Sequence, residues 1–235
     1  MKKNYRIWIY PLNTMVIFLL SLSISFKSIA QESTETVQDI GGNVYPIIII
    51  GKQVWMKEDL KTTRYSNGDS IGTTTPTTLD ITNEPTPKYQ WAYDGNESNV
   101  EIYGRLYTWY AATDDRNICP TGWHVPTDAD WSTLTTFLVG EYVAGGKLKE
   151  KGITHWKSPN TGATNESGFT ALPGGYRYFD GNGTFYYIKY DGRFWSSTES
   201  GTNYAWSRSM LYNYGSVSRY ENYKKEGFSV RCIRN

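Results

Sequence analysis

Histidine and cysteine are scarce in this sequence, and neither sign of charge dominates it. The 235 residues include only 2 histidines and 2 cysteines. Lys and Arg total 24 against 23 Asp and Glu, which gives a formal net charge of +1. A chain so close to neutrality has no global field that attracts nucleic acid or anionic lipid. We therefore expect no nucleic acid as its partner.

Catalytic motifs are also missing. The sequence has no HExxH, no GxSxG, no phosphate-binding P-loop and no GxGxxG before a helix. His124 follows Trp123, which favours a packed or backbone-bonded imidazole over a general base, and His155 has no obvious partner. A glycosidase needs two carboxylates that face each other, and the sequence leaves this alternative open. Most acidic residues adjoin Gly, Asn or Lys, as in surface turns, and we expect no catalytic residues and no enzyme.

The longest apolar run lies near the N-terminus. It covers residues 15–26, follows the charges of Lys2, Lys3 and Arg6, and precedes the small-residue site Ser28-Ile29-Ala30. This order is that of a signal peptide, and a run of about a dozen residues is too short to span a bilayer comfortably. A retained anchor is the alternative. We predict a signal peptide over residues 1–30 and a flexible, polar lead over residues 31–38.

Export changes what the two cysteines imply. The residue directly after the cleavage site is Gln31 and not a cysteine, so we expect no lipid anchor and an exported protein that is secreted, periplasmic or associated with the outer surface. An oxidising compartment favours a disulfide between Cys119 and Cys232. Closing so long a loop stabilises the fold by about 4 to 5 kcal/mol in the chain-entropy model. A redox or copper-binding pair is the alternative, which neither a CxxC spacing nor a nearby histidine supports.

Turn residues and apolar patterns predict an α+β domain. Residues 44–50 and 53–56 flank the turn Gly51-Lys52 and predict a hairpin. Residues 67–87 are typical of a loop, whereas residues 102–112 favour a short helix. A clearer helix is predicted after Thr127, an N-cap residue with Asp130 three positions on. Beyond Gly168, recurrent Gly and Pro turns separate short aromatic strands, as in an antiparallel meander.

The last forty residues combine Tyr, Asn, Ser, Gly and Arg between two apolar ends. Tyr gives a large contact area with few torsions to freeze, while Ser, Asn and Gly adapt their hydrogen bonds, so binding loops use this mixture. We expect one contiguous exposed face of ligand-binding residues, formed by Tyr204, Ser207, Arg208, Tyr212, Asn213, Tyr214, Ser218, Arg219, Tyr220, Asn222 and Tyr223. Beneath it we expect buried Trp195, Trp206, Phe228 and Val230. A half-exposed sheet with ordinary turns is the alternative.

Four separated blocks carry a resemblance to a known family. They read GKQVWMKEDLK (residues 51–61), CPTGWHVPT (119–127), GFTALPGG (168–175) and GFSVRC (227–232). Together they resemble the Fibrobacter succinogenes major paralogous domain, and the likeness runs from about Asp39 to Asn235. That family is similar to the C-type lectin-like fold. The resemblance therefore implies one α+β domain over 39–235, with short helices packed on antiparallel strands and long loops.

A second resemblance concerns residues 194–232. This segment resembles the variable region of proteins that retroelements diversify by mutating adenines in a template copy. The resemblance implies fixed frame residues, among them Trp195, Trp206 and Phe228, and varied residues between them. An invariant C-terminus shared by relatives without a retroelement is the alternative.

Cofactor and ligand chemistry are less defined. Lectin-like folds often carry calcium on loop oxygens, which Asn165, Glu166 and Asp180 offer. The Glu-Pro-Asn signature of sugar-binding lectins is absent, so we assign no cofactor or metal and leave calcium open. Trp156 and Trp206 are the indoles to examine for sugar stacking.

The expected function is that of an exported, non-catalytic ligand-binding module. We expect its partner to be a protein at a cell surface, with no membrane span after signal removal. A carbohydrate-binding module is one alternative, and a glycan would then be the ligand. A Cys-dependent oxidase or a hydrolase on a lectin-like fold is another.

Overall fold

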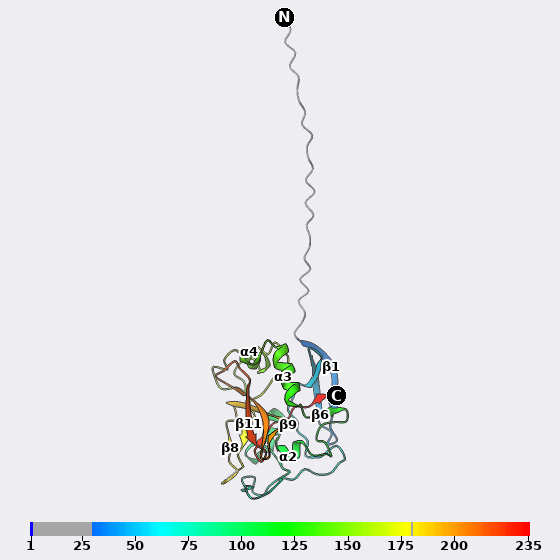
Figure 1. Cartoon of the computed structure of the whole chain (residues 1–235), viewed down its shortest axis with the longest axis vertical. Coiled ribbons are helices and arrows are strands. Elements are labelled where there is room, and N and C mark those ends of the chain that lie inside the picture. Colours follow the sequence, from blue (N-terminus) through cyan, green and yellow to red (C-terminus); the bar gives the residue numbers. More distant parts are fainter. Residues whose placement is uncertain (2–29, 180) are drawn as a thin grey trace.

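The computed structural model describes residue 1, residues 30–179 and residues 181–235 (Figure 1). Apart from its two end residues, the predicted signal peptide lies outside these residues, and so does Asp180. Within the described part of the chain, no helix is long and apolar enough to cross a membrane.

Three antiparallel sheets form the framework. The first has the order β1-β2-β3-β13-β6 and consists of β1 (Ala30–Gln38), β2 (Val44–Ile50), β3 (Gln53–Met56), β13 (Ile233–Arg234) and β6 (Trp123–His124). The second has the order β4-β5-β12-β7-β8 and consists of β4 (Gln90–Trp91), β5 (Leu106–Thr108), β12 (Gly227–Phe228), β7 (Tyr176–Arg177) and β8 (Phe185–Tyr186). The third has the order β11-β10-β9 and consists of β11 (Ser218–Tyr223), β10 (Tyr204–Leu211) and β9 (Asp191–Gly201).

The predicted hairpin over residues 44–56 is confirmed as β2 and β3, whose register pairs Ile50 with Gln53. Residues 31–38 were expected to be a flexible lead, and they form most of β1 instead. This strand pairs with β2 from Ala30 opposite Ile50 to Gln38 opposite Val44. The polar composition of the strand hid it, because an edge strand keeps its backbone hydrogen bonds whatever its side chains are.

Short helices connect the strands. They are the 3₁₀ turns η1 (Tyr93–Gly95) and η2 (Glu97–Asn99), and the α-helices α1 (Val100–Tyr103), α2 (Trp109–Ala112), α3 (Asp128–Phe137) and α4 (Glu141–Leu148). The helix predicted after Thr127 is confirmed as α3, and Thr127 and Asp130 complete a capping box. The helix predicted over 102–112 is wrong as one element. Gly104, at φ 69°, ends α1, and the buried strand β5 separates it from α2.

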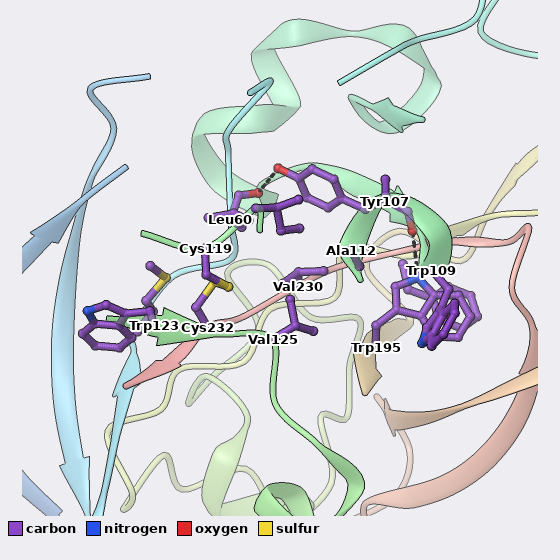
Figure 2. Packing of buried hydrophobic residues seen from close by; sticks show 14 of the residues in the cluster. Leu60, Tyr107, Trp109, Ala112, Cys119, Trp123, Val125, Trp195, Val230 and Cys232 are labelled. Atoms are coloured by element: carbon purple, nitrogen blue, oxygen red, sulfur yellow. Dashed lines mark hydrogen bonds between the residues drawn. A yellow bond between two sulfur atoms is a disulfide. The ribbon is translucent and has the colours of Figure 1, made fainter. Parts of the chain in front are cut away.

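The disulfide predicted between Cys119 and Cys232 is confirmed, with Cα atoms 5.9 Å apart. Both cysteines are buried in the cluster that also contains Trp123, Val125 and Val230 (Figure 2). A second cluster forms where Trp131 and Leu134 of α3 pack among buried aromatic residues of the strands. Mostly antiparallel sheets with few short helices confirm the α+β class.

The core anchors the strand that carries the C-terminal segment. Trp195 of β9 stacks on Phe228 with ring centroids 4.2 Å apart. Its indole Nε1 donates to the carbonyl oxygen of Tyr107 at 2.7 Å (Figure 2). Trp195, Phe228 and Val230 are all fully buried, as the sequence predicts. Figure 1 shows α3 and α4 together at one end of the molecule, beyond β9 and β11.

Candidate functional site

The C-terminal segment forms the three-stranded sheet, and its register divides the predicted site between two faces. Cross-strand partners point to the same side of a sheet, and alternate residues point to opposite sides. Trp206 is opposite Glu221, and Arg208 is opposite Arg219, so these four share one face. The other face carries the partners Ser207 and Tyr220, followed by Asn222 and Ser218. The expectation of one contiguous face is therefore wrong.

Two of the predicted residues are buried and cannot contact a ligand directly. Ser207 and Arg208 each have 0% of their surface exposed. The Ser207 hydroxyl donates to the side-chain oxygen of Asn222 at 2.7 Å, and the Arg208 guanidinium donates to Asp128 of α3 at 2.8 Å. Composition did not reveal this burial, because a small hydroxyl and an arginine paired with a carboxylate can both be accommodated inside the fold.

On the α3 side of the hairpin, Arg219 is fixed by three contacts to two residues. Its guanidinium carbon lies 3.1 Å from the ring centroid of Trp206, and its Nε and Nη2 each lie 2.9 Å from an oxygen of Asp128. Trp206, expected to be buried, is half-buried under this arginine. Tyr204 and Tyr223 lie on the same face, with ring centroids 4.5 Å apart.

The opposite side opens into a hollow of about 520 Å³. Five tyrosines line it and will be called the tyrosine cradle: Tyr176, Tyr187, Tyr190, Tyr212 and Tyr214. Its remaining lining residues are Asp191, Arg193, Leu211 and Asn213. Of the predicted residues, this hollow therefore collects the three of the loop after β10, at positions 212 to 214.

Ring contacts join four of the five tyrosines into a continuous wall. Tyr176 stacks on Tyr187 with centroids 5.9 Å apart, and Tyr187 meets Tyr190 edge to face at 6.4 Å. Tyr190 meets Tyr212 edge to face at 5.3 Å. The outer rings remain open to solvent, since Tyr187 is 55% exposed and Tyr214 is 56% exposed. The wall thus offers aromatic surface that is already ordered.

Sequence reasoning missed three of the five tyrosines of the cradle. Tyr176, Tyr187 and Tyr190 lie before the C-terminal segment, on β7 and in the connection from β8 to β9. The signal that could have found them is the run Phe185-Tyr186-Tyr187-Ile188-Lys189-Tyr190, which has the same tyrosine richness as the segment itself. In the sequence this run resembles one more short aromatic strand, because only the fold brings it beside residue 212.

A second hollow, of about 350 Å³, adjoins the cradle. Leu211 and Tyr214 line both hollows, and the second is completed by Ser216, Ser218 and Tyr220. Tyr220 is 47% exposed on the edge strand β11. Five predicted residues therefore line one connected surface, namely Tyr212, Asn213, Tyr214, Ser218 and Tyr220.

The loop that bears Tyr187 and Tyr190 is held in an uncommon conformation. Tyr187 has φ 64° and Lys189 has φ 72°, a region that residues other than glycine seldom adopt. The carbonyl oxygen of Tyr187 accepts from the backbone N–H of Tyr190 at 2.9 Å and from that of Asp191 at 3.0 Å. Strained backbone of this kind persists only where its surroundings fix it, and it concentrates at functional sites.

A buried ion pair forms the floor of the hollow. Asp191 is 1% exposed, and its two oxygens accept from Arg193 Nε at 2.7 Å and from the hydroxyl of Ser209 at 2.7 Å. The Arg193 guanidinium lies 4.2 Å from the ring centroid of Tyr176. Burial alone would lower the pKa of Arg193, but the nearby Asp191 carboxylate outweighs it and raises the pKa above its usual value. The Arg193 guanidinium therefore stays positively charged, with the Asp191 carboxylate as its partner on the Nε side.

The other candidate groups lie elsewhere. His124 meets the side-chain oxygens of Asn235 at 2.7 Å and Asp130 at 3.3 Å, so its partners are side chains and not the backbone. His155 meets Glu150 at 2.8 Å. Trp156 is buried.

The groups considered for calcium are engaged with other partners. Asn165 accepts the backbone N–H of Thr170 at 2.9 Å, and Glu166 pairs with Lys147 at 2.8 Å. Asp180 lies outside the described residues. Among the described residues, no group of three or more His, Cys, Asp or Glu could hold a metal ion.

Comparison with known proteins gives one finding. A model of the Fibrobacter succinogenes major domain matches residues 48–234 of the chain. The comparisons with curated proteins and with solved structures return no significant match. The matched region contains all three sheets except β1 and the first residues of β2, and it includes the whole tyrosine cradle.

Proposed function

The chain belongs to the Fibrobacter succinogenes major domain family, and we propose that it is an exported, non-catalytic module that binds a protein partner at a cell surface. The tyrosine cradle and the adjoining hollow form its binding surface. The observation that carries this proposal is the continuous, half-exposed wall of tyrosine rings around the 520 Å³ hollow.

The cradle has the composition and rigidity that protein recognition uses. Tyrosine is enriched at binding surfaces because it buries a large area and loses little side-chain entropy. Here the ring contacts and the hydrogen-bonded backbone at Tyr187 already restrict the side chains before binding, so less entropy is lost when a ligand binds. A preordered surface of this kind converts more of its contact energy into affinity.

Several features favour a protein ligand over a glycan. Trp156 is buried, and Arg219 covers the face of Trp206, so neither offers an open indole for a sugar ring. The two hollows share Leu211 and Tyr214 and so form one extended surface. Extended polar and aromatic surfaces are typical of protein–protein interfaces.

The disulfide and its surroundings support export and a non-catalytic role. Disulfides persist in oxidising compartments, where exported proteins reside. Cys119 and Cys232 are at most 1% exposed and lie in the main hydrophobic cluster, where a substrate has no access to the sulfur atoms. This burial counts against a Cys-dependent oxidase.

Two finer points complete the proposal. The arrangement of short helices on antiparallel strands with long, ligand-bearing connections suits the C-type lectin-like fold that the family resemblance implies. Diversification of the C-terminal segment would act on one wall of the hollow, that formed by Tyr212 and Tyr214, and would leave the wall at Tyr187 constant.

A peptide-display experiment tests the proposal. The oxidised protein is immobilised and panned against a random dodecapeptide library, and the same protein is applied to a glycan array. We expect peptides whose affinity falls at least tenfold in the double variant Tyr187→Ala/Tyr214→Ala. Tyr223→Ala, an exposed tyrosine on the opposite face of the hairpin, serves as the matched control and should bind normally. Selective glycan binding that depends on the cradle would instead favour a carbohydrate-binding module.

A further inference from the structure

Arg193 has unused hydrogen-bonding capacity at the floor of the hollow. Its Nε is the nitrogen that donates to Asp191. In the part of the chain that the structure describes, neither of its Nη nitrogens has a hydrogen-bond partner. A guanidinium carries five N–H donors in a planar fork, and the four on the Nη atoms are therefore available. The side chain lines the hollow and keeps 20% of its surface exposed.

The surroundings of Arg193 orient it through Nε and the plane of the guanidinium, and its Nη edge makes no hydrogen bond to the described residues. Asp191, which is itself held by the hydroxyl of Ser209, accepts from Arg193 Nε, and the ring centroid of Tyr176 lies 4.2 Å from the guanidinium carbon. Glu226, a carboxylate that is 3% exposed, adds to the negative potential that keeps the arginine charged. The buried ammonium of Lys149, which binds the loop at Leu211 and Tyr214, places a second positive charge beside the hollow.

The donors and the walls together define a ligand. A guanidinium edge recognises a carboxylate through two parallel hydrogen bonds, and such charge-assisted pairs are stronger than neutral ones. Tyrosine rings around it supply apolar contact for the carbon atoms next to the carboxylate. Partial exclusion of water by the ring wall strengthens the pair relative to one on an open surface.

We infer that the hollow captures a carboxylate of the partner protein, an Asp or Glu side chain or a C-terminus, on the Nη edge of Arg193 between the tyrosines of the cradle. The inference rests on the proposed protein-binding function and names the group that the site recognises. Arg193 is thus the charged anchor of the site, and the tyrosines are its contact surface.

The test uses the dodecapeptides selected on the wild-type protein. Each is resynthesised with its Asp and Glu residues changed to Asn and Gln, or with an amidated C-terminus. We expect the selected peptides to share a carboxylate whose replacement weakens binding at least tenfold. The same peptides are also tested on the double variant Asp191→Asn/Arg193→Met, which lacks the guanidinium. This variant removes both charges of the ion pair and so avoids leaving a buried aspartate unpaired. In this variant the acidic peptide and its amide version should bind equally weakly.

The outcomes separate this inference from the proposed function. If peptides depend on Tyr187 and Tyr214 but bind equally well as acids and amides, carboxylate capture by Arg193 is overturned and protein binding stands. If no peptide depends on the cradle, both are overturned. If uronic-acid or sialic-acid glycans bind through Arg193 and peptides do not, the carboxylate site is real but its source is a glycan, which overturns the protein assignment. Thermal unfolding of the double variant, monitored by circular dichroism, verifies that it is folded.

Discussion

The ammonium nitrogen of Lys149 lies 2.8 Å from the carbonyl oxygen of Tyr214. It also donates to the carbonyl oxygens of Leu211 and Thr161, each at 3.0 Å. The side chain is fully buried, at the end of α4. Burial lowers the pKa of Lys149 to about 8, so at pH 7 most molecules keep the third proton and one donor for each carbonyl. A single buried lysine therefore holds both ends of the loop that carries Tyr212 and Tyr214.

We predict that Lys149→Met destabilises the protein and loosens this loop. The change removes the ammonium donor from three carbonyl oxygens, although that of Leu211 keeps the backbone N–H of Tyr214 at 3.3 Å. We expect the loss to cost about 3 kcal/mol of unfolding free energy. Urea unfolding measures that loss, and hydrogen exchange should accelerate most at residues 212–215. Lys151→Met, at an exposed position nearby, is the control and should change little. Equal unfolding curves and unchanged exchange would show that the three hydrogen bonds contribute nothing.

Local patterns in the sequence predicted much of the fold. Short-range chemistry determines the capping pair at Thr127 and Asp130 and the hairpin around Gly51. The disulfide was predictable because two cysteines allow only one intrachain bridge. β1 was missed because its exposed edge needs no apolar pattern. The break between α1 and α2 depends on the buried strand β5, which is fixed by distant partners such as Gly227.

The candidate site was only half visible in the sequence. Tyr212 and Tyr214 were found because tyrosine and asparagine concentrate in the C-terminal segment. Tyr187 and Tyr190 are brought to them by the fold, and no local signal reports that proximity. Ser207 and Arg208 were included wrongly because composition does not reveal which face of a strand is covered. The register of β10 with β11 and the position of α3 determine which face of the strand is covered.

We predict that the ion pairs at Asp128 stabilise the hairpin only above acidic pH. Burial of Asp128 opposes its ionisation, but hydrogen bonds from Arg219 and Arg208 outweigh it and lower the pKa below the usual value. A lowered pKa in the folded state means that the unfolded chain takes up the proton first as the pH falls. The stabilisation is therefore complete above about pH 4, the usual aspartate value, and is lost below it.

The measurement compares wild type with Asp128→Asn across pH. The wild type should be the more stable protein at pH 7, and the difference should shrink as the pH falls below about 4. Asp115→Asn is the control, because Asp115 lies at an exposed position. A difference that stays constant down to pH 2 would mean that the asparagine acts through packing and not through lost charge.

We predict that Val139→Asn stabilises the protein by about 1 kcal/mol. Val139 follows α3 with φ 77°, a left-handed conformation that strains a β-branched side chain. Its side chain is 76% exposed, so the substitution sacrifices little burial. Asparagine tolerates this conformation, and the gain should appear in the midpoint of urea unfolding. Val143→Asn, in the helix α4, should bring no gain, and an equal gain there would remove backbone strain as the explanation.

The last prediction concerns the DNA around the coding sequence. If the C-terminal segment is diversified, a near-copy of the codons for residues 195–232 should lie beside a reverse transcriptase gene and differ at adenines. The fold sharpens this expectation, because amino-acid differences between isolates should fall at Tyr212, Asn213, Tyr214, Ser218 and Tyr220, which line the two hollows.

Buried positions should resist the same variation. A changed Arg208 would remove one of the two arginines that pair with Asp128, and a changed Ser207 would remove the partner of Asn222. Arg193 and Tyr187 lie before the copied segment, so every variant would keep the same charged anchor and one constant aromatic wall. Sequencing the locus from several isolates measures this. Differences spread evenly over buried and hollow-lining codons would contradict the binding surface, whereas a locus without the copy would leave a binder of fixed specificity.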